Sequence, residues 1–376
     1  MKRKGSAALE RYVFDLSSTE WAEPPDYDVI NAAVFVARGS VNAYPDHTAA
    51  RVRELLAARH ALEPHQIVLG NGAGDLLQTA ALTLLSRDEE LVTPWPSYPL
   101  YPLMARRAGA RPVAVALSDG QVDAEALLAA ISGRTRVLVI CNPNDPTGTY
   151  LDSPLLAELL SRLPEQVYVL LDEAVVQFQD REHEDACLRL VESFPRLVVF
   201  RSFSNAYGLS GLRAGYAVGS PEAARLLDSL APVLGVNALT QAAVECALGR
   251  GDTELARRRE MVIAQRRRLD DALAELALEG PRSEAHFVWM RARGMSSMQL
   301  AAAFQRAGVV VFPGSVLGDA DHVRVSLKSP LATDRLLAVL PGIATSSAAQ
   351  GWEANGAEVM SRPAAMAYGV LEGSAA

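Results

Sequence analysis

Short apolar runs alternate with longer amphipathic segments along the chain from about Tyr44. The runs Gln66–Leu69, Thr135–Cys141 and Leu197–Phe200 are rich in β-branched and other apolar residues, which is typical of buried strands. Thr48–Leu62, by contrast, is rich in Arg, Leu and Ala and has the pattern of an amphipathic helix. Strands that alternate with helices predict βαβ crossovers, and therefore an α/β fold whose mostly parallel sheet carries helices on both faces.

The same pattern predicts the other elements of this region. Further strands are expected at Glu89–Thr93, Arg111–Leu117 and Gln166–Asp172, and further helices at Asp75–Leu85, Pro99–Ala108, Asp123–Ile131 and Ser153–Leu163. Ligands of such sheets bind beyond the carboxyl ends of the strands, so the loops that follow strands are where chemistry is expected.

The last third of the chain predicts a different arrangement. A long helical stretch from about Ala238 to Leu278, interrupted near Gly249–Gly251, leads into a smaller α+β region. That region is expected to contain strands His286–Met290, Val309–Phe312 and His322–Leu327 and helices Met298–Ala307 and Leu331–Leu340. From Ala344 on, the chain is rich in Ala, Ser and Gly and predicts a poorly ordered tail. We therefore expect an N-terminal segment (1–39) that joins a small domain, a large domain (40–237), an interdomain helix with the small C-terminal domain (238–342), and a disordered tail (343–376).

The composition is that of a globular protein with a sizeable core: 376 residues, of which 49% are hydrophobic and 21% charged. No apolar run approaches the roughly 18 residues of a membrane span, and no leader or membrane contact is expected. A net charge of −8 without a basic stripe argues against a nucleic-acid partner. Three cysteines in unrelated contexts fit a cytoplasmic, reducing location and argue against a disulfide scaffold or a metal site.

Two segments that follow predicted strands carry candidate chemistry. The small-residue turn 71–75 opens a helix, so its backbone N–H groups and the helix dipole favour a phosphate there, although ordinary glycine turns have the same pattern. Asp172 ends a buried strand, where a carboxylate is costly unless paired. A protonated heterocycle nitrogen would be a suitable partner, and a helix cap for the next segment is the alternative.

Two further loops add polar groups. Residues 141–148 form a proline-rich turn at a strand end, with several polar side chains. Residues 202–215 combine hydroxyl groups, glycines and Arg213, which together could hold a phosphate dianion by charge-assisted hydrogen bonds. Taken singly, each loop could equally be an ordinary surface turn.

In this order and spacing, the four segments resemble the fold-type I pyridoxal-phosphate (PLP) aminotransferases, and most closely the histidinol-phosphate aminotransferase branch, over roughly Asp15 to Pro341. The resemblance implies a three-layer αβα large domain that binds the cofactor, a smaller α+β domain, and a homodimer that acts on a small amino or keto acid. It implies that the amides of Ala73 and Gly74 bind the cofactor phosphate, and that Ser202, Ser204 and Arg213 complete the phosphate site. It implies that Tyr98 stacks on the pyridine ring, that Asp172 pairs with the ring nitrogen, and that Tyr44 contacts the phosphate of the neighbouring subunit's cofactor. Arg324 is implied to bind the substrate's anionic group with two hydrogen bonds.

The sequence departs from this family where the family carries its Schiff-base lysine. Asn205 stands at that position, and an amide can neither form an imine nor act as a base. Lysine is also rare here, because only Lys2, Lys4 and Lys328 among the 36 basic residues are lysines. The loss of a general base alone costs roughly 10²–10⁴ in rate.

Other positions of the family's site differ too. Val175 stands where a tyrosine would bond the cofactor's phenolic oxygen, and Asp145 stands where an asparagine precedes Pro-Thr-Gly, with Asn144 beside it as a possible substitute. His286 replaces an asparagine. Phe312 replaces an arginine that would grip a substrate phosphate, which argues against histidinol phosphate and favours a carboxylate held by Arg324 alone.

Two residues could in principle stand in for the lysine. Lys328 shares a strand face with Arg324 but lies four residues on, roughly 13 Å away along the strand, which favours a surface or substrate-contact role. His286 is the better candidate base, since imidazole titrates near neutrality, although a packed structural histidine is the alternative.

Three hypotheses remain open at the level of sequence. The first is an enzyme that binds PLP or pyridoxamine 5′-phosphate noncovalently and works without the lysine. The second is a catalytically inactive dimer with a regulatory or scaffolding role. The third is a normal aminotransferase in which Asn205 is an engineered or inherited knock-out.

Overall fold

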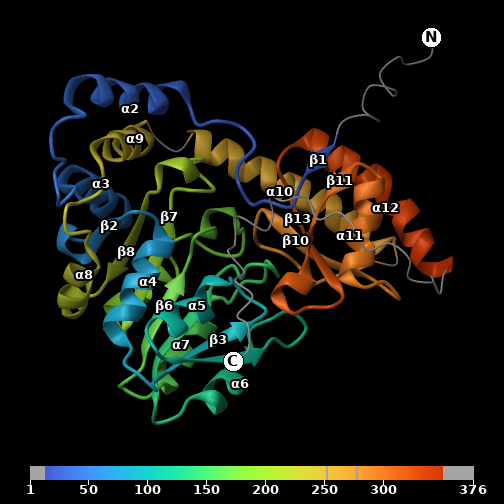
Figure 1. Cartoon of the computed structure of the whole chain (residues 1–376), viewed down its shortest axis with the longest axis horizontal. Helices are drawn as coiled ribbons and strands as arrows, with labels where there is room; N and C mark the ends of the chain where they lie inside the picture. The colour runs from blue at the N-terminus through green and yellow to red at the C-terminus, as the bar shows by residue number, and fades with distance from the viewer. Residues whose placement is uncertain (1–12, 251–252, 277, 350–376) are drawn as a thin grey trace, which may run out of the picture. The chain divides into compact units, whose positions relative to one another are not determined.

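The computed structural model describes residues 13–250, 253–276 and 278–349, and the chain divides into two compact units (Figure 1). The larger unit comprises Glu20–Ala264 with Pro281–His286. Of the described residues, the smaller unit comprises 13–19, 265–276, 278–280 and 287–349. Residues 20–39, assigned from sequence to a segment that joins the small domain, therefore fall in the larger unit.

A seven-stranded sheet forms the centre of the larger unit, in the strand order β2-β8-β7-β6-β5-β3-β4. Its strands are β2 (Ile67–Gly70), β3 (Glu90–Trp95), β4 (Arg111–Ala116), β5 (Thr135–Cys141), β6 (Tyr168–Asp172), β7 (Leu197–Ser202) and β8 (Gly215–Gly219). Strands β4, β3, β5, β6 and β7 run parallel to one another, whereas β8 is antiparallel to both β2 and β7. The predicted α/β class with a mostly parallel sheet is confirmed.

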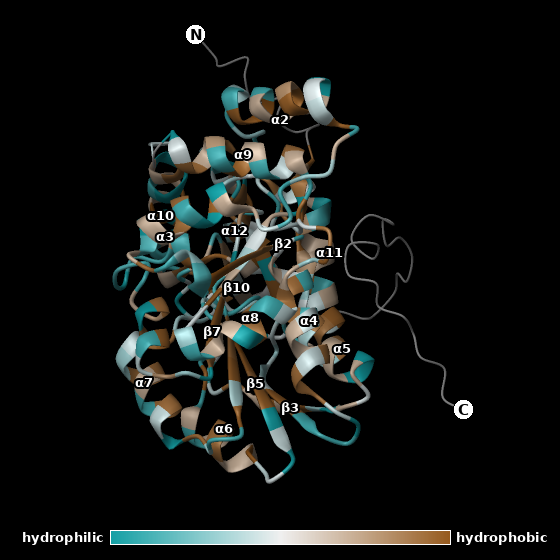
Figure 2. Ribbon diagram, turned by 90° about the vertical axis from the view of Figure 1, so that its left-hand side faces the viewer, coloured by the Kyte–Doolittle hydropathy of each residue, from teal (hydrophilic) through white to brown (hydrophobic). Residues whose placement is uncertain are grey.

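Helices cover both faces of this sheet. They are α2 (Tyr27–Ser40), α3 (Ala50–His60), α4 (Ala73–Leu84), α5 (Leu100–Arg107), α6 (Ala124–Ala130), α7 (Ser153–Arg162), α8 (Ala224–Leu230) and α9 (Ala238–Gly249). Successive side chains of a strand point to opposite faces, so Leu170 and Val198 belong to the apolar cluster with α4, α5 and α8, while Leu171 and Val199 belong to the one with α3 and α7. Figure 2 shows these central strands as the most hydrophobic part of the sheet layer.

The smaller unit is built on a four-stranded antiparallel sheet of order β12-β13-β10-β9. Its strands are β9 (Leu278–Glu279), β10 (Phe287–Ala292), β12 (Phe312–Pro313) and β13 (His322–Ser326), and a separate parallel pair joins β1 (Phe14–Asp15) to β11 (Val309–Val310). Helices α11 (Ser297–Arg306) and α12 (Pro330–Ala349) pack their apolar side chains with those of one sheet face, such as Val288 and Val325. The long helix α10 (Thr253–Ala274) contains the boundary between the two units.

Several elements differ from the sequence expectation. Strand β8 lies at the end of the predicted glycine-rich loop, where small residues hid its pattern, and α2 lies in a segment for which no helix was predicted. The expected strand Val309–Phe312 is two short strands. The predicted tail is wrong at its start, because α12 continues to Ala349, and the rest of it (350–376) lies outside the described residues. Among the helices of the described residues, none is both long and apolar enough to cross a membrane.

Candidate functional site

Asp172 is held at the carboxyl end of β6 by two hydrogen bonds. Its Oδ2 accepts from the hydroxyl of Tyr101 at 2.8 Å, and its Oδ1 accepts from the backbone N–H of Ala174 at 3.1 Å. The carboxyl group is buried, and this burial raises its pKa to about 6, even though both hydrogen bonds act in the opposite direction. A buried carboxylate with two fixed donors can still accept a hydrogen bond from a ligand nitrogen.

Arg213 lies over the first turn of α4. A Cβ atom on Gly72 would lie 2.6 Å from its Nη2 atom, so the guanidinium comes this close only because residue 72 is glycine. Gly72 also has a φ of +100°, a conformation that glycine adopts readily. The same guanidinium donates to the carbonyl oxygen of Ser210 at 2.9 Å and lies 3.5 Å from the Oγ of Ser204.

The first two residues of α4 add backbone donors at this point. The N–H groups of Ala73 and Gly74 have no acceptor earlier in the helix, because a helix begins with unpaired donors. Gly215 packs tightly against them, since a Cβ there would lie 2.2 Å from the nitrogen of Ala73. Two amides, a guanidinium and a hydroxyl thus surround one position, which is the donor set of an anion site.

The turn that carries Asn205 follows directly after β7. Ser202 is buried and its Oγ accepts from the N–H of Ser204 at 3.0 Å, while the carbonyl of Asn205 accepts from Gly208 at 3.0 Å. Arg258 supports the turn by donating to the carbonyl of Ala206 at 3.1 Å. The Asn205 side chain is partly exposed, so its backbone rather than its amide maintains this turn.

The turn after β5 is tied to the segment that precedes Tyr98. Asn144 is buried, and its amide nitrogen donates to Pro96 O at 3.1 Å and Thr147 Oγ1 at 2.9 Å. Its amide oxygen accepts from Ser97 Oγ at 2.7 Å. Asp145 lies close enough to Asp172 for its charge to raise that carboxyl's pKa. Asn144 therefore positions the Tyr98 segment, and its predicted contact with the cofactor remains a prediction.

Tyr98 and Tyr101 form an aromatic pair at the start of α5. Their ring centroids are 5.8 Å apart in an edge-to-face arrangement. Tyr101 is fully buried and connects Tyr98 to Asp172 through its hydroxyl. The sequence analysis missed Tyr101, because nothing in its local sequence shows that α5 meets the end of β6.

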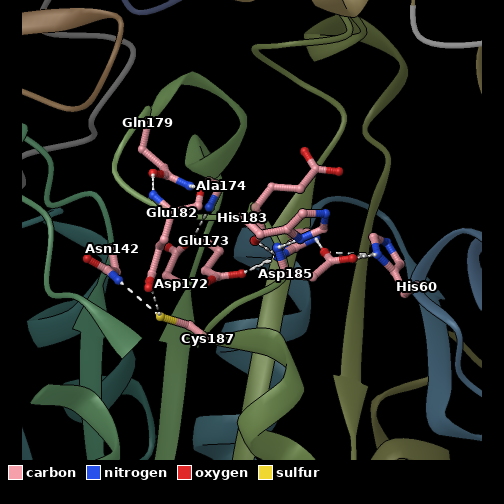
Figure 3. Close-up of polar contacts among 12 residues, drawn as sticks. His60, Asn142, Asp172, Glu173, Ala174, Gln179, Glu182, His183, Asp185 and Cys187 are labelled. Carbon is pink, nitrogen blue, oxygen red and sulfur yellow. Dashed lines mark hydrogen bonds and ion pairs between the residues drawn. The ribbon is translucent and has the colours of Figure 1, made fainter. Parts of the chain in front are cut away.

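A buried ion-pair network lies behind Asp172, on the other side of β6. Arg201 donates from Nε and Nη2 to Glu173 Oε2 at 2.9 and 2.8 Å, and from Nη1 to Asp185 at 2.6 Å. His60 contacts Asp185 at 3.1 Å and Tyr216 at 2.9 Å. Figure 3 shows Glu173, Asp185 and His60 in this chain of contacts, beside Asp172. Burial raises the pKa of Glu173 to about 7 against the opposing charge of Arg201.

Arg324 belongs to the smaller unit and is described there. It is buried on β13, its Nη2 donates to the carbonyl of Ser17 at 3.0 Å, and its guanidinium lies 4.7 Å from the ring centroid of Phe312 and 5.5 Å from that of Phe287. Two aromatic rings that contact one guanidinium restrict its rotation. The residue that replaces the family's phosphate-gripping arginine, Phe312, therefore contacts Arg324 directly.

His286 and Val175 are buried in the larger unit. The His286 ring packs against Phe178 at a centroid distance of 4.8 Å, and Phe178 stacks on Trp21 at 6.0 Å. These contacts fit the interpretation of His286 as a packed structural histidine. Its role as a base remains a prediction. No group of three potential metal ligands was found among the described residues.

The side chain of Tyr44 is exposed, at 87%. Nearby, Gly235 approaches the backbone of His47 so closely that a Cβ would lie 2.5 Å from its Cα. The segment before α3 is thus fixed while the Tyr44 ring extends into solvent. A separate hollow of about 530 Å³ borders the anion site, lined by residues that include Asn71, Arg213 and Asn237.

The larger unit therefore fits a ligand with a phosphate group and a protonated ring nitrogen. The guanidinium of Arg213 lies against Gly72 at the start of α4, and Asp172 is a buried carboxylate with a fixed donor on each oxygen. Both features belong to PLP and to pyridoxamine 5′-phosphate. The structure brings together Asp172, Tyr98 and the Asn144 turn as one group, and Gly72, Ser202, Ser204 and Arg213 as another.

Comparison with known proteins agrees with this reading. A family model for aminotransferase class I and II matches residues 12–340. The aromatic amino acid aminotransferase of Mycobacteroides abscessus is 36% identical over 322 residues, covering 86% of this chain and 90% of that protein. The protein of the same name from Mycolicibacterium smegmatis is 38% identical over 309 residues, covering 82% and 84%. The crystal structure of histidinol-phosphate aminotransferase from Sinorhizobium meliloti in complex with PLP superimposes with a TM-score of 0.79 at 25% identity, covering 92% of this chain and 96% of that one.

Proposed function

The chain belongs to the aminotransferase class I and II family, and from this premise we propose that it binds PLP or pyridoxamine 5′-phosphate noncovalently and acts on a small amino or keto acid. The observation that carries the proposal is the anion site, in which the guanidinium of Arg213 lies over Gly72 at the first turn of α4. An arginine beside the unpaired amides of a helix N-terminus supplies the positive charge and the donors that a phosphate group needs.

The predicted site residues of the larger unit divide the binding of this cofactor among them. Ala73, Gly74, Ser204 and Arg213 bind the phosphate, and the ionised Asp172 accepts a hydrogen bond from the protonated ring nitrogen. When bound, the cofactor supplies an electron sink that stabilises negative charge on the substrate's Cα. The face of Tyr98 limits the movement of the ring and excludes water from it.

Asn205 limits what this site can do with a proton. Its amide can donate and accept hydrogen bonds but cannot carry a proton between substrate and cofactor atoms. We therefore expect the protein to bind the cofactor with the specificity usual for its family. We expect its turnover to be several orders of magnitude slower than that of a protein with lysine at position 205. His286 stays the candidate for an alternative base.

The substrate proposal rests on the smaller unit and on the relatives. Arg324, whose guanidinium lies against the rings of Phe287 and Phe312, is the residue that would hold the substrate's carboxylate. The relatives are named aromatic amino acid aminotransferases. Aromatic amino acids are therefore the first donors to test, and we place the reaction in the cytoplasm, where the three cysteines stay reduced.

A catalytically inactive dimer with a regulatory or scaffolding role is the second candidate. The observation that favours it is that three residues together differ from the family pattern. They are Asn205, Val175 and Phe312. Turnover of any amino donor that is abolished by Arg324→Ala would exclude this candidate. The absence of turnover, together with tight cofactor binding, would favour it.

Native mass spectrometry of the purified protein with added PLP tests the main proposal. We expect a cofactor adduct that disappears on denaturation, even after borohydride treatment, and that is lost in Arg213→Met. An adduct that survives denaturation after borohydride and maps to Lys328 would show that the covalent link has moved there. No adduct at any concentration would contradict cofactor binding.

A further inference from the structure

We propose that Tyr101 is a positioning residue for the cofactor ring, because its hydroxyl orients the Asp172 carboxylate and its ring supports Tyr98. This inference rests on the proposed cofactor binding and adds to it a residue outside the family motifs quoted above. Tyr101 acts through Asp172 and Tyr98, so its role can be tested by substitutions that leave Arg213 and Asn205 unchanged.

The geometry defines the first part of this role. An aspartate side chain rotates easily about its last bond, since that torsion has only broad minima. Asp172 has one donor on each oxygen, Tyr101 on Oδ2 at 2.8 Å and Ala174 on Oδ1 at 3.1 Å. Two donors on two different oxygens fix the carboxylate plane, and with it the direction in which its other lone pairs point. Removal of the hydroxyl leaves the carboxylate held at one oxygen only.

The second part of the role concerns the charge of Asp172. Burial raises the pKa of Asp172 to about 6, and the hydroxyl of Tyr101 works against this because it stabilises the ionised form. The other ionisable groups that act on this cluster are Asp145, whose charge raises the pKa of Asp172, and Cys141 on β5, a buried thiol whose pKa is raised. Burial raises the pKa of Tyr101 itself well above its ordinary value, so Tyr101 remains a donor throughout the working pH range.

The third part is the contact with Tyr98. The two rings meet edge to face with centroids 5.8 Å apart, and the N–H of Tyr101 donates to the carbonyl of Tyr98 at 3.2 Å. Tyr101 thus contacts both side chains that are assigned to the pyridine ring. A phenylalanine at position 101 would keep the contact with Tyr98 and remove only the bond to Asp172.

The sign of the pH effect follows from these contacts. Only ionised Asp172 can pair with a protonated ring nitrogen, so the affinity for PLP falls as the pH falls through the pKa of Asp172. Without the Tyr101 hydroxyl the pKa of Asp172 rises, and the affinity begins to fall at a higher pH. A residue that served only to pack the core would weaken binding without moving this midpoint.

The experiment measures the PLP dissociation constant of wild type, Tyr101→Phe and Tyr168→Phe between pH 5 and 9, by absorbance titration of the apoprotein. Tyr168 is the matched control, since it starts the same strand and its ring contacts Arg196 instead. For Tyr101→Phe we expect the PLP dissociation constant to be about tenfold larger at neutral pH. We expect the midpoint of its pH dependence to lie about one pH unit higher, as for the loss of a hydrogen bond to a charged group. The control is expected to match wild type in both quantities.

The same substitution in an Asp172→Asn background completes a double-mutant cycle. We expect Tyr101→Phe to change PLP affinity little in that background, because no carboxylate remains to orient. Equal losses in both backgrounds, or an unmoved midpoint, would overturn the positioning role while cofactor binding stood. If the wild type itself fails to bind PLP, the proposed function fails, and the role of Tyr101 toward the cofactor fails with it.

Discussion

We propose that the side chain of Asn205 limits the chemistry of this site, while the backbone of Asn205 takes part in the hydrogen bonds of the turn. The turn is fixed by the hydrogen bond from Gly208 to the Asn205 carbonyl and by Arg258 on the Ala206 carbonyl. The side chain is partly exposed, so a longer one can be placed there without loss of packing. The sequence is therefore expected to differ from an ordinary member of its family in reactivity and not in fold.

Substitution Asn205→Lys tests this directly. It supplies a primary amine at the family position, so we expect PLP to become covalently linked, with an adduct that survives denaturation after borohydride reduction. Mass spectrometry of digested peptides should map the adduct to position 205. The double variant Asn205→Lys with Lys328→Met is the control and should retain the adduct. If only Lys328 becomes labelled, the family position of the lysine has been wrongly assigned.

At the residue scale, the sequence pointed to those candidate residues that stand in local motifs. Asp172 and Arg213 could be found because a carboxylate at a strand end and an arginine in a glycine loop are local patterns. Tyr101 could not be found, because its bond to Asp172 joins residues 71 positions apart. The interaction of Phe312 with Arg324 was likewise invisible, since it depends on the register of β12 with β13.

At the element scale, β6 and β7 are joined at the ends that carry the site. Glu173 follows Asp172, and Arg201 precedes Ser202, so their ion pair holds the two strand ends together on the side away from the site. The backbone continues the pairing through the N–H of Glu173, which donates to Phe200 at 2.8 Å. Removal of one partner of such a buried ion pair destabilises the protein by much more than the whole pair stabilises it. The reason is that the other partner is left as an unpaired buried charge.

Substitution Arg201→Met should therefore destabilise the protein strongly. It leaves Glu173 and Asp185 without their buried cation, and we expect the free energy of unfolding to fall by about 3–5 kcal/mol. Chemical denaturation followed by circular dichroism measures this loss. The exposed Arg189 on the neighbouring turn offers a matched control, since Arg189→Met should change stability by no more than about 0.5 kcal/mol. Equal stabilities of the two variants would show that the network contributes little.

The elements themselves were predicted unevenly, for physical reasons. The parallel strands β5, β6 and β7 are buried on both faces, and their continuous apolar runs made them plain in the sequence. Strand β8 has the sequence Gly-Tyr-Ala-Val-Gly and relies on pairing with β2 and β7 rather than on its own pattern. The end of α12 was placed too early, because a stretch rich in Ala and Ser can continue a helix as well as end one.

At the scale of the whole molecule, large apolar side chains are exposed on and just after α2, before α3 and before α9. We call them the α2 apolar surface; its members are Tyr27, Phe35, Val41, Tyr44, Val233 and Leu234, each at least 68% exposed. Helix α2 packs against α9, beside which it lies in Figure 1, and its buried residues are Val29 and Ala33. Exposed apolar groups of this kind mark protein interfaces, and we expect a second copy of this chain to cover them.

Substitution Phe35→Asp should convert this dimer into monomers. A carboxylate at the centre of an apolar interface would be desolvated without a partner, which costs enough to separate the subunits. Sedimentation velocity measures the mass, and Leu155→Asp on α7 is the control, because that leucine is also exposed but lies outside the α2 apolar surface. A wild type that sediments as a monomer at all concentrations would contradict the dimer.

The proposed dimer also bears on the cofactor site, and this gives the assembly a testable chemical consequence. If Tyr44 of a second copy reaches the cofactor phosphate, then PLP binds the dimer more tightly than the monomer, and by linkage PLP strengthens dimerisation by the same factor. Phe35→Asp should then weaken PLP binding although no residue of the anion site has changed, and Tyr44→Ala should weaken it without dissociating the dimer. PLP titrations at several protein concentrations separate the two effects, since affinity should rise with wild-type concentration and stay constant for Phe35→Asp. Equal affinity in monomer and dimer would mean that each chain forms its cofactor site alone.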